Sequence, residues 1–319
     1  SGSWDASDTT HWSATSGGTG GASVPGASDA VILDGSSGGG TVTVTASVSI
    51  NSFNGNTFTG TFDTNDQSFT CSNTFDFTGN STRTLSLGSS TITTGALTTS
   101  FSVANIAGLT FNAETSTIVI GGGNGSLSSG GVTFYNVQFT GGGSNNTIYG
   151  SSNTFNNLSY AGVATKTNNL ILQSNQTVSG TFSANGNSLI NRLLISSSTL
   201  GTTRTITAAA VSLTNVDFRD ITGAGAAADF TGSSLGNALG NSGISFTAPV
   251  TRYWVGNGGN WSDTAHWSGS SGGSSGASVP LCHDTVTFDA NSISSASQTI
   301  LTDMVRLGAN ISLTGVTNT

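Results

Sequence analysis

The octapeptides Val132–Phe139 (VTFYNVQF) and Val211–Phe218 (VSLTNVDF) share one pattern, in which apolar residues alternate on both sides of a central asparagine. A degenerate version of this pattern is Phe155–Tyr160 (FNNLSY). Alternation with a period of two is typical of a β-strand with one buried face. Because the asparagine shifts the phase of the alternation, each stretch is predicted to form two short strands.

The central asparagines Asn136, Asn157 and Asn215 are predicted to lie at corners between these short strands. Asparagine tolerates the left-handed backbone conformation and hydrogen-bonds to its own backbone. Corner asparagines on successive coils are also expected to stack, with their amides bonded to one another along the stacking axis.

Strand–corner–strand units recur at a short and regular spacing, as from Phe58 to Phe77 and from Asn136 to Asn157. One such unit cannot bury its apolar face alone, whereas stacked units bury a continuous core. The predicted fold is therefore all-β, a right-handed parallel β-solenoid. A solenoid of roughly a dozen coils, at about 4.8 Å per stacked strand, is about 60 Å long.

Tandem antiparallel β-sandwiches are the alternative fold, because short strands separated by frequent turns serve them equally well. Asn-Gly pairs, the strongest hairpin signal, occur at Asn54-Gly55 and Asn185-Gly186. Each pair is followed at once by another asparagine rather than by a strand, which favours wider corners over tight hairpins.

The composition is that of a β protein with very little charge. Only 7% of the residues are charged, against about 25% in an ordinary soluble domain, while 34% are hydrophobic and 16 are Phe. The net charge of −8 and the scattered arginines argue against nucleic-acid binding. No apolar run is long enough to span a membrane. Cys71 and Cys282 are predicted to be ordinary thiols rather than a disulfide.

A second, longer repeat joins the two ends of the sequence. His11-Trp12 and His266-Trp267 are offset by 255 positions, as are the Val-Pro and Asp residues that follow them. Residues 1–255 are therefore predicted to form one module with a Trp-rich entry segment at about 1–34, and residues 256–319 to begin a second copy. Val31 and Leu33, with their counterparts 255 positions later, are predicted to face the core, and Ile32 to face outward.

All five tryptophans fall within or beside these two entry segments, which suggests two roles for them. Exposed rings would form an aromatic platform for a glycan, whereas buried rings would pack the first layer of each module. The tucked position of His-Trp-Ser before a Gly-rich loop favours packing. The candidate glycan-binding residues are Trp4, Trp12, Trp254, Trp261 and Trp267.

No carboxylate pair has the spacing of a catalytic site. A glycosidase needs two carboxyl groups about 5–9.5 Å apart. Asp29 and Asp34 are separated by about 16 Å of extended chain and lie on opposite faces of a strand. Asp217 and Arg219 are expected to share an outward face as a surface ion pair. The chain is therefore predicted not to be an enzyme, although β-helical folds include polysaccharide-degrading ones.

No cofactor is expected either. A calcium site built from carboxylates and backbone carbonyls is conceivable near Asp5 and Asp8, or near Asp63 and Asp66. The Gly-rich array that binds calcium in some β-helices does not occur, so these aspartates are weak candidates.

The stretch 252–267 (RYWVGNGGNWSDTAHW), followed by Val-Pro and Asp284–Asp289 (DTVTFD), resembles a module of large exported surface proteins of uncultured bacteria and of phage virion-associated fibre proteins. Stretches within 110–221 resemble the β-helical repeats that follow it there. The resemblance implies a structural or adhesive role and an extracellular location, on a cell or virion surface. It supplies no catalytic residues.

The expected function is that of a structural repeat unit of a surface fibre or filament, which associates with itself through module-to-module β contacts. The alternative is a phage tail fibre or bacterial adhesin that binds host polysaccharide. A polysaccharide-degrading enzyme is the third and least favoured reading of the same fold.

Overall fold

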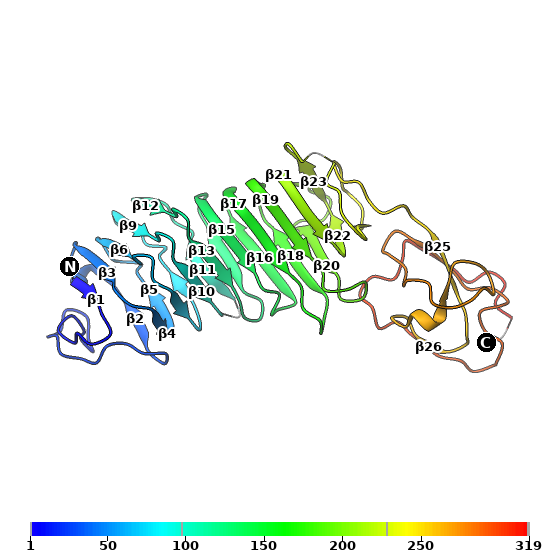
Figure 1. The fold of residues 1–319 in the computed structure, drawn as a ribbon, viewed down its shortest axis with the longest axis horizontal. Helices are drawn as coiled ribbons and strands as arrows, with labels where there is room; N and C mark the ends of the chain where they lie inside the picture. Colours follow the sequence, from blue (N-terminus) through cyan, green and yellow to red (C-terminus); the bar gives the residue numbers. More distant parts are fainter. Residues whose placement is uncertain (1, 97, 228, 318–319) are drawn as a thin grey trace.

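The computed structural model describes residues 2–96, 98–227 and 229–317. Its strands stack side by side into a long rod, with the N-terminal end at one tip and the second copy of the entry segment at the other (Figure 1). The rod is a parallel β-solenoid of about 12 turns. This confirms the predicted fold class, and the alternative of tandem antiparallel sandwiches is wrong.

Three parallel sheets form the faces of the solenoid. The first contains β1 (Gly2–Trp4), β3 (Thr41–Val44), β6 (Thr61–Asp63), β9 (Arg83–Ser86) and β12 (Leu109–Asn112). The second contains β4 (Val48–Ile50), β7 (Phe69–Cys71), β10 (Thr91–Thr94), β13 (Thr117–Ile120), β15 (Thr133–Phe139), β17 (Asn153–Ala161), β19 (Gln176–Asn185), β21 (Arg204–Thr214) and β23 (Ile221–Ala224). The third contains β2 (Ala30–Ile32), β5 (Ser52–Asn54), β8 (Phe75–Asp76), β11 (Thr99–Val103), β14 (Ser126–Ser129), β16 (Asn145–Gly150), β18 (Asn168–Leu172), β20 (Leu193–Ser197), β22 (Val216–Arg219) and β24 (Gly236–Asn237).

Coil length varies along the rod. Val137 pairs with Leu158 and Asn136 with Asn157, so this coil has the predicted spacing. Other coils are longer, and one of them runs from Phe182 to its partner Val211. The additional residues lie in the loops and corners between strands, where insertions disturb the stacking least.

Apolar side chains from all three sheets fill the interior. Val31 and Leu33 are buried while Ile32 is 63% exposed, so the predicted register of this strand is confirmed. Phenylalanines stack on one another along the axis: the ring centroids of Phe53 and Phe75 are 4.7 Å apart, and those of Phe75 and Phe101 are 5.0 Å apart. Stacked aromatic pairs add about 0.5–1.5 kcal/mol to the free energy gained by burial alone.

The asparagines behave differently from one another. Asn136 and Asn157 pair in register inside the continuous strands β15 and β17, and the amide of Asn157 donates to the side-chain oxygen of Asn136 at 3.0 Å. The stacked amides are thus present, but the predicted break into two short strands at these residues is wrong, since each strand runs through its asparagine without left-handed backbone. Asn215 is a true corner, with a φ of 55° and its amide donating to the Gly186 carbonyl at 3.1 Å.

The second copy of the entry segment builds a small sheet of its own in the order β27-β25-β28-β30, beside the pair β26-β29. Its first strand begins at Thr251. Two short 3₁₀ turns complete the fold, one in each copy. The remaining elements are η1 (Gly35–Ser37), β25 (Thr251–Trp254), β26 (Gly259–Asn260), η2 (Thr264–His266), β27 (Trp267–Ser268), β28 (Thr285–Thr287), β29 (Ile300–Leu301) and β30 (Asn310–Ser312).

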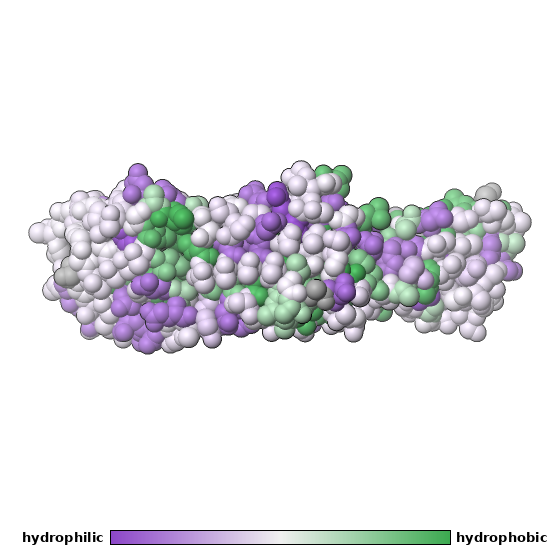
Figure 2. Space-filling view, turned by 90° about the horizontal axis from the view of Figure 1, so that it is seen from above, coloured by the Kyte–Doolittle hydropathy of each residue, from purple (hydrophilic) through white to green (hydrophobic). Residues whose placement is uncertain are grey.

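The face of the rod seen in Figure 2 is largely pale, which marks residues of intermediate hydropathy, with apolar and strongly hydrophilic residues in scattered patches. This agrees with a sequence rich in Ser, Thr and Gly and poor in charge. Among the residues that the structure describes, no helix has the length and apolar character needed to cross a membrane.

We expect Phe75→Ala to lower the free energy of unfolding by about 3–5 kcal/mol, the usual cost of deleting a buried aromatic ring. The ring of Phe75 stacks between those of Phe53 and Phe101, so its loss leaves a cavity with two unsupported walls. Ile32→Ala is the matched control, because Ile32 is an exposed strand residue. Urea unfolding of both variants measures the difference, and equal stability would contradict the stacked core.

We expect Asn157→Ala to lower the free energy of unfolding by about 1–3 kcal/mol, since it leaves a partly buried main-chain donor without its acceptor. The side-chain oxygen of Asn157 accepts from the Thr181 N–H at 2.8 Å, and its amide donates to Asn136. Asn156→Ala is the control, one residue away in the same strand. Thermal unfolding that ranks the two variants equally would show that the stacked amides are incidental.

Candidate functional site

The two Trp-rich entry motifs fold in the same way. The ring centroids of Trp4 and Trp12 lie 4.8 Å apart at an interplanar angle of 70°, and those of Trp261 and Trp267 lie 4.8 Å apart at 68°. Main-chain bonds repeat as well: the N–H of Gly21 donates to the Thr9 carbonyl at 3.0 Å, and the bond between their counterparts 255 positions later is also 3.0 Å. The long sequence repeat is therefore a structural repeat.

Aspartates fix the local conformation of each motif by capping its turns. The Asp34 carboxylate accepts hydrogen bonds from the N–H groups of Ser36 and Ser37. The Asp34 N–H in turn donates to the Ser37 hydroxyl oxygen, which completes a capping box at η1. Hydrogen bonds to its carboxylate, of which that from the Ser16 hydroxyl has the largest effect, hold the pKa of Asp34 below its usual value. Its counterpart Asp289 makes the equivalent bond with the Ser292 hydroxyl, at 3.0 Å.

The predicted glycan platform does not fit the position of most of the tryptophans. Trp4, Trp254, Trp261 and Trp267 are buried, so none of these four rings offers a face to a sugar. Their burial agrees with the packing role. Trp12 alone is partly exposed, and it packs against the edge of the solenoid core.

In the second copy, β25 lies between β27 and β28, pairing antiparallel with the first and parallel with the second. Its Trp254 stacks flat on the ring of His266, at a centroid distance of 4.7 Å, and meets Trp267 edge-on at 5.1 Å. The first copy contains counterparts of β27 and β28, namely Trp12-Ser13 and β2, whereas the residues that match β25 at the offset of 255 would precede residue 1.

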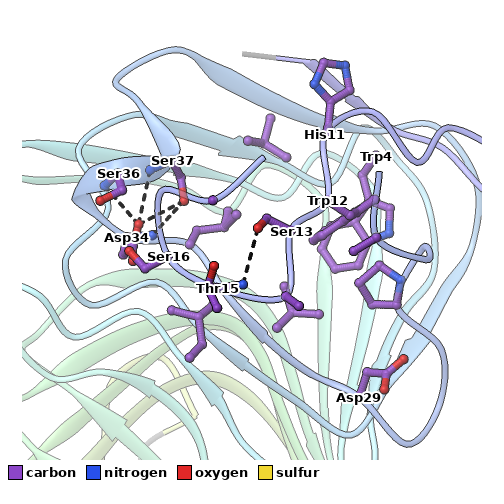
Figure 3. Close-up of a pocket in the computed structure, with 18 of the residues that line it drawn as sticks. Trp4, His11, Trp12, Ser13, Thr15, Ser16, Asp29, Asp34, Ser36 and Ser37 are labelled. Carbon is purple, nitrogen blue, oxygen red and sulfur yellow. Dashed lines mark hydrogen bonds between the residues drawn. The ribbon is translucent and has the colours of Figure 1, made fainter. Parts of the chain in front are cut away.

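A groove of about 500 Å³ occupies the corresponding place in the first copy. In Figure 3, Trp4 and Trp12 lie side by side at one end of it and Asp34 lies at the other, while Asp29 stands apart from both. The indole nitrogen of Trp12 is buried and has no hydrogen-bond partner among the described residues. The groove is thus lined by an aromatic pair and by strand β2.

The junction between the first module and the second copy is a polar site that is buried from solvent. Asp217, fully buried on β22, accepts from Arg192 at 2.6 Å and from Arg306 of the second copy at 2.5 Å. Burial alone would raise the pKa of Asp217, but the two arginines outweigh it and hold this pKa below its usual value. The predicted surface ion pair of Asp217 with Arg219 is wrong, because the second copy covers this face of β22.

Two further side chains of the second copy contact the last coil of the first module. The ring of His283 accepts from the Asn237 N–H at 2.9 Å and bonds to the Thr247 carbonyl at 2.8 Å. The thiol of Cys282 lies against Gly236, where a Cβ would come within 2.9 Å of its sulfur. Burial, followed by the nearby charge of Asp217, raises the pKa of Cys282 to about 12, so this thiol is unreactive.

Both cysteines are free, as predicted. Asp29 and Asp34 do not form a catalytic pair: Asp29 accepts from the Gly26 N–H at 2.8 Å, while Asp34 caps η1. The carboxylate of Asp5 accepts from the N–H groups of Ser7 and Asp8, which lowers its pKa and makes it a turn cap. Among the described residues, no group of three or more His, Cys, Asp or Glu is placed to hold a metal ion.

Comparison with known proteins adds no assignment, since no family model, curated protein or solved structure matches the chain. The functional argument therefore rests on the groove and the junction.

The junction depends on residues that sequence reasoning did not single out. In the sequence, Arg192 and Arg306 are two of several scattered arginines. They lie 25 and 89 positions from Asp217, and only the folded chain brings them into contact with it.

We expect Asp217→Asn to lower the free energy of unfolding by about 3–5 kcal/mol at neutral pH, because it leaves two arginines without their shared counter-charge. Because the pKa of Asp217 is depressed in the folded protein, its contribution is present above the unfolded value of about 3.9 and is lost as the pH falls through the lower folded pKa. The variant should therefore lose part of the acid sensitivity of the parent chain.

The control for this experiment is Asp229→Asn, at an exposed residue. Chemical unfolding at neutral pH and at several acidic pH values measures both variants. If Asp217→Asn and Asp229→Asn unfold alike at every pH, the charge cluster does not stabilise the junction.

Proposed function

We propose that the chain is a structural protein of the extracellular surface, a repeat unit of a fibre in which modules join end to end through β contacts. The junction carries this proposal. A second entry motif covers the open end of the preceding solenoid, with Asp217, Arg306 and His283 holding the two together. Repetition of such a contact extends a rod without limit, because its two sides are different surfaces.

The character of the interior supports a structural role. It is a continuous apolar core from Trp4 to Leu235, with aromatic rings stacked along the axis. The aspartates considered as catalytic candidates cap turns or belong to the buried junction. A rod of this kind resists extension through many parallel main-chain bonds, which suits a load-bearing fibre.

Binding to host polysaccharide is the second candidate, and one observation favours it: Trp12 is partly exposed beside a groove at the end of the rod. Against it, the other four rings named as a platform are buried.

We expect the full chain to form rods longer than one molecule as its concentration rises, because the second entry motif can cover the last coil of a neighbouring copy in place of its own. Sedimentation velocity across a concentration series, with electron micrographs of the same samples, measures this. Incubation with a glycan panel, following both binding and cleavage, distinguishes the other two functions, with Trp12→Ala as the variant for sugar binding. A chain that stays monomeric at high concentration would contradict the fibre, and glycan binding abolished by Trp12→Ala would establish the adhesin.

A further inference from the structure

The first sheet of the solenoid ends at β12, whereas the other two sheets continue through the rest of the rod. The coil that follows contains the continuous strand β15, which pairs with β13 only from Asn136 onward. The first residues of β15 pair with β17 on the next coil and not with β12. A shallow groove of about 380 Å³, here called the side groove, is lined by residues of both β12 and β15. Its volume is in the range of small-ligand sites.

The end of the first sheet leaves an aromatic ring uncovered in the side groove. Phe62, Leu85 and Phe111 occupy matched positions on β6, β9 and β12. Phe62 and Leu85 are fully buried between neighbouring strands, whereas Phe111, on the last strand of its sheet, is only partly buried. Its ring meets that of Phe134 edge-on, at a centroid distance of 5.2 Å. Tyr135, also partly buried, lines the groove from β15, so two partly exposed aromatic side chains face a common space.

Polar side chains without internal partners line the same groove. They belong to Glu114, Tyr135 and Asn156, and none of them makes a side-chain hydrogen bond within the part of the chain that the structure describes. Their neighbours differ: the amide of Asn157 donates to a side chain on the adjacent coil, and the hydroxyl of Ser179 donates to a main-chain carbonyl. The groove therefore offers donors and acceptors that the fold itself does not use.

The lining residues follow the long axis of the rod. Three of them stand on the outward face of strands that are in register, β15, β17 and β19, each directly after an inward apolar residue. These three are Tyr135, Asn156 and Ser179. Paired strands lie about 4.8 Å apart, so a polar group recurs at that interval along the groove. A ligand built from repeated polar units, such as a chain of sugar rings, matches this arrangement.

We propose that the side groove binds a segment of uncharged polysaccharide, with the sugar chain lying along the rod. The apolar C–H face of a sugar ring packs on the rings of Phe111 and Tyr135, as apolar groups do on aromatic side chains in small-ligand sites. Its hydroxyl groups bond to the free amide of Asn156 and carboxylate of Glu114. Glu114 is the only charged residue among those that line the groove, so it disfavours an anionic glycan. The site shares no residue with the groove beside Trp12, and it does not depend on the fibre proposal.

The binding experiment titrates the full chain with neutral hexasaccharides of glucose, mannose and N-acetylglucosamine, and with hexagalacturonate as the anionic probe. Calorimetry should show one-to-one binding of at least one neutral hexasaccharide and weaker or no binding of hexagalacturonate. Glu114→Gln keeps the hydrogen-bonding oxygen and removes the charge, so it should narrow the difference between neutral and anionic probes. If no neutral hexasaccharide binds, or if hexagalacturonate binds the parent chain more tightly, the proposal is wrong.

Three variants locate the bound sugar. We expect Tyr135→Ala to weaken binding at least about tenfold, since it removes one of the two aromatic rings of the groove. Asn156→Ala should weaken it about fivefold through one lost hydrogen bond, and it should leave thermal unfolding unchanged because the side chain has no internal partner. Tyr149→Ala, at an exposed tyrosine of β16 in another sheet, is the matched control and should bind like the parent. Equal affinity of Tyr135→Ala and Tyr149→Ala would overturn the proposal.

Further outcomes separate this site from the other surfaces of the rod. Binding that is lost in Trp12→Ala and retained in Tyr135→Ala would place the sugar in the groove beside Trp12 and overturn the side groove. If Tyr135→Ala instead abolishes self-association in sedimentation and no hexasaccharide binds, the side groove is a contact between copies and the proposal is wrong. Sugar binding through Tyr135 by a chain that never forms rods would support this inference and contradict the fibre.

Discussion

The main-chain hydrogen bonds between one coil and the next are the interaction on which the rest of the structure depends. A single coil closes no core by itself, so its apolar face is stable only beneath a neighbour. Stacking also brings matched positions to within about 4.8 Å of each other along the rod. Charged side chains would repel one another at that spacing, whereas asparagines such as Asn136 and Asn157 bond directly.

The same dependence makes the end of each module a structural problem. The last coil would leave apolar side chains and main-chain groups uncovered, and the second entry motif supplies the cover. This cover removes the Asp217 carboxylate from water, which is unfavourable. Ion pairs with two arginines from different modules offset the lost hydration. Such a cluster tolerates the loss of no single member, so it ties the second copy firmly to one site.

Much of the fold was predictable because a solenoid is specified locally. The alternation around Val137 and Leu158 set which side chains face inward, and the spacing set which strands stack. The continuity of the strand through Asn136 was harder to predict, since the sequence marks a change of phase and does not say whether the strand breaks there. Glycines such as Gly143 follow from stacking, because a Cβ there would lie 1.1 Å from the carbonyl oxygen of the coil below.

The sequence by itself determined the parallel solenoid, the inward residues of its strands and the repeat of the entry motif, because each is encoded in a period that neighbouring residues share. Only the tertiary structure decided that Asp217 is buried, because the alternation of its strand places the side chain on the outward face of its own coil. Whether an outward residue meets water depends on what covers that face, and here Arg306 arrives from 89 positions away.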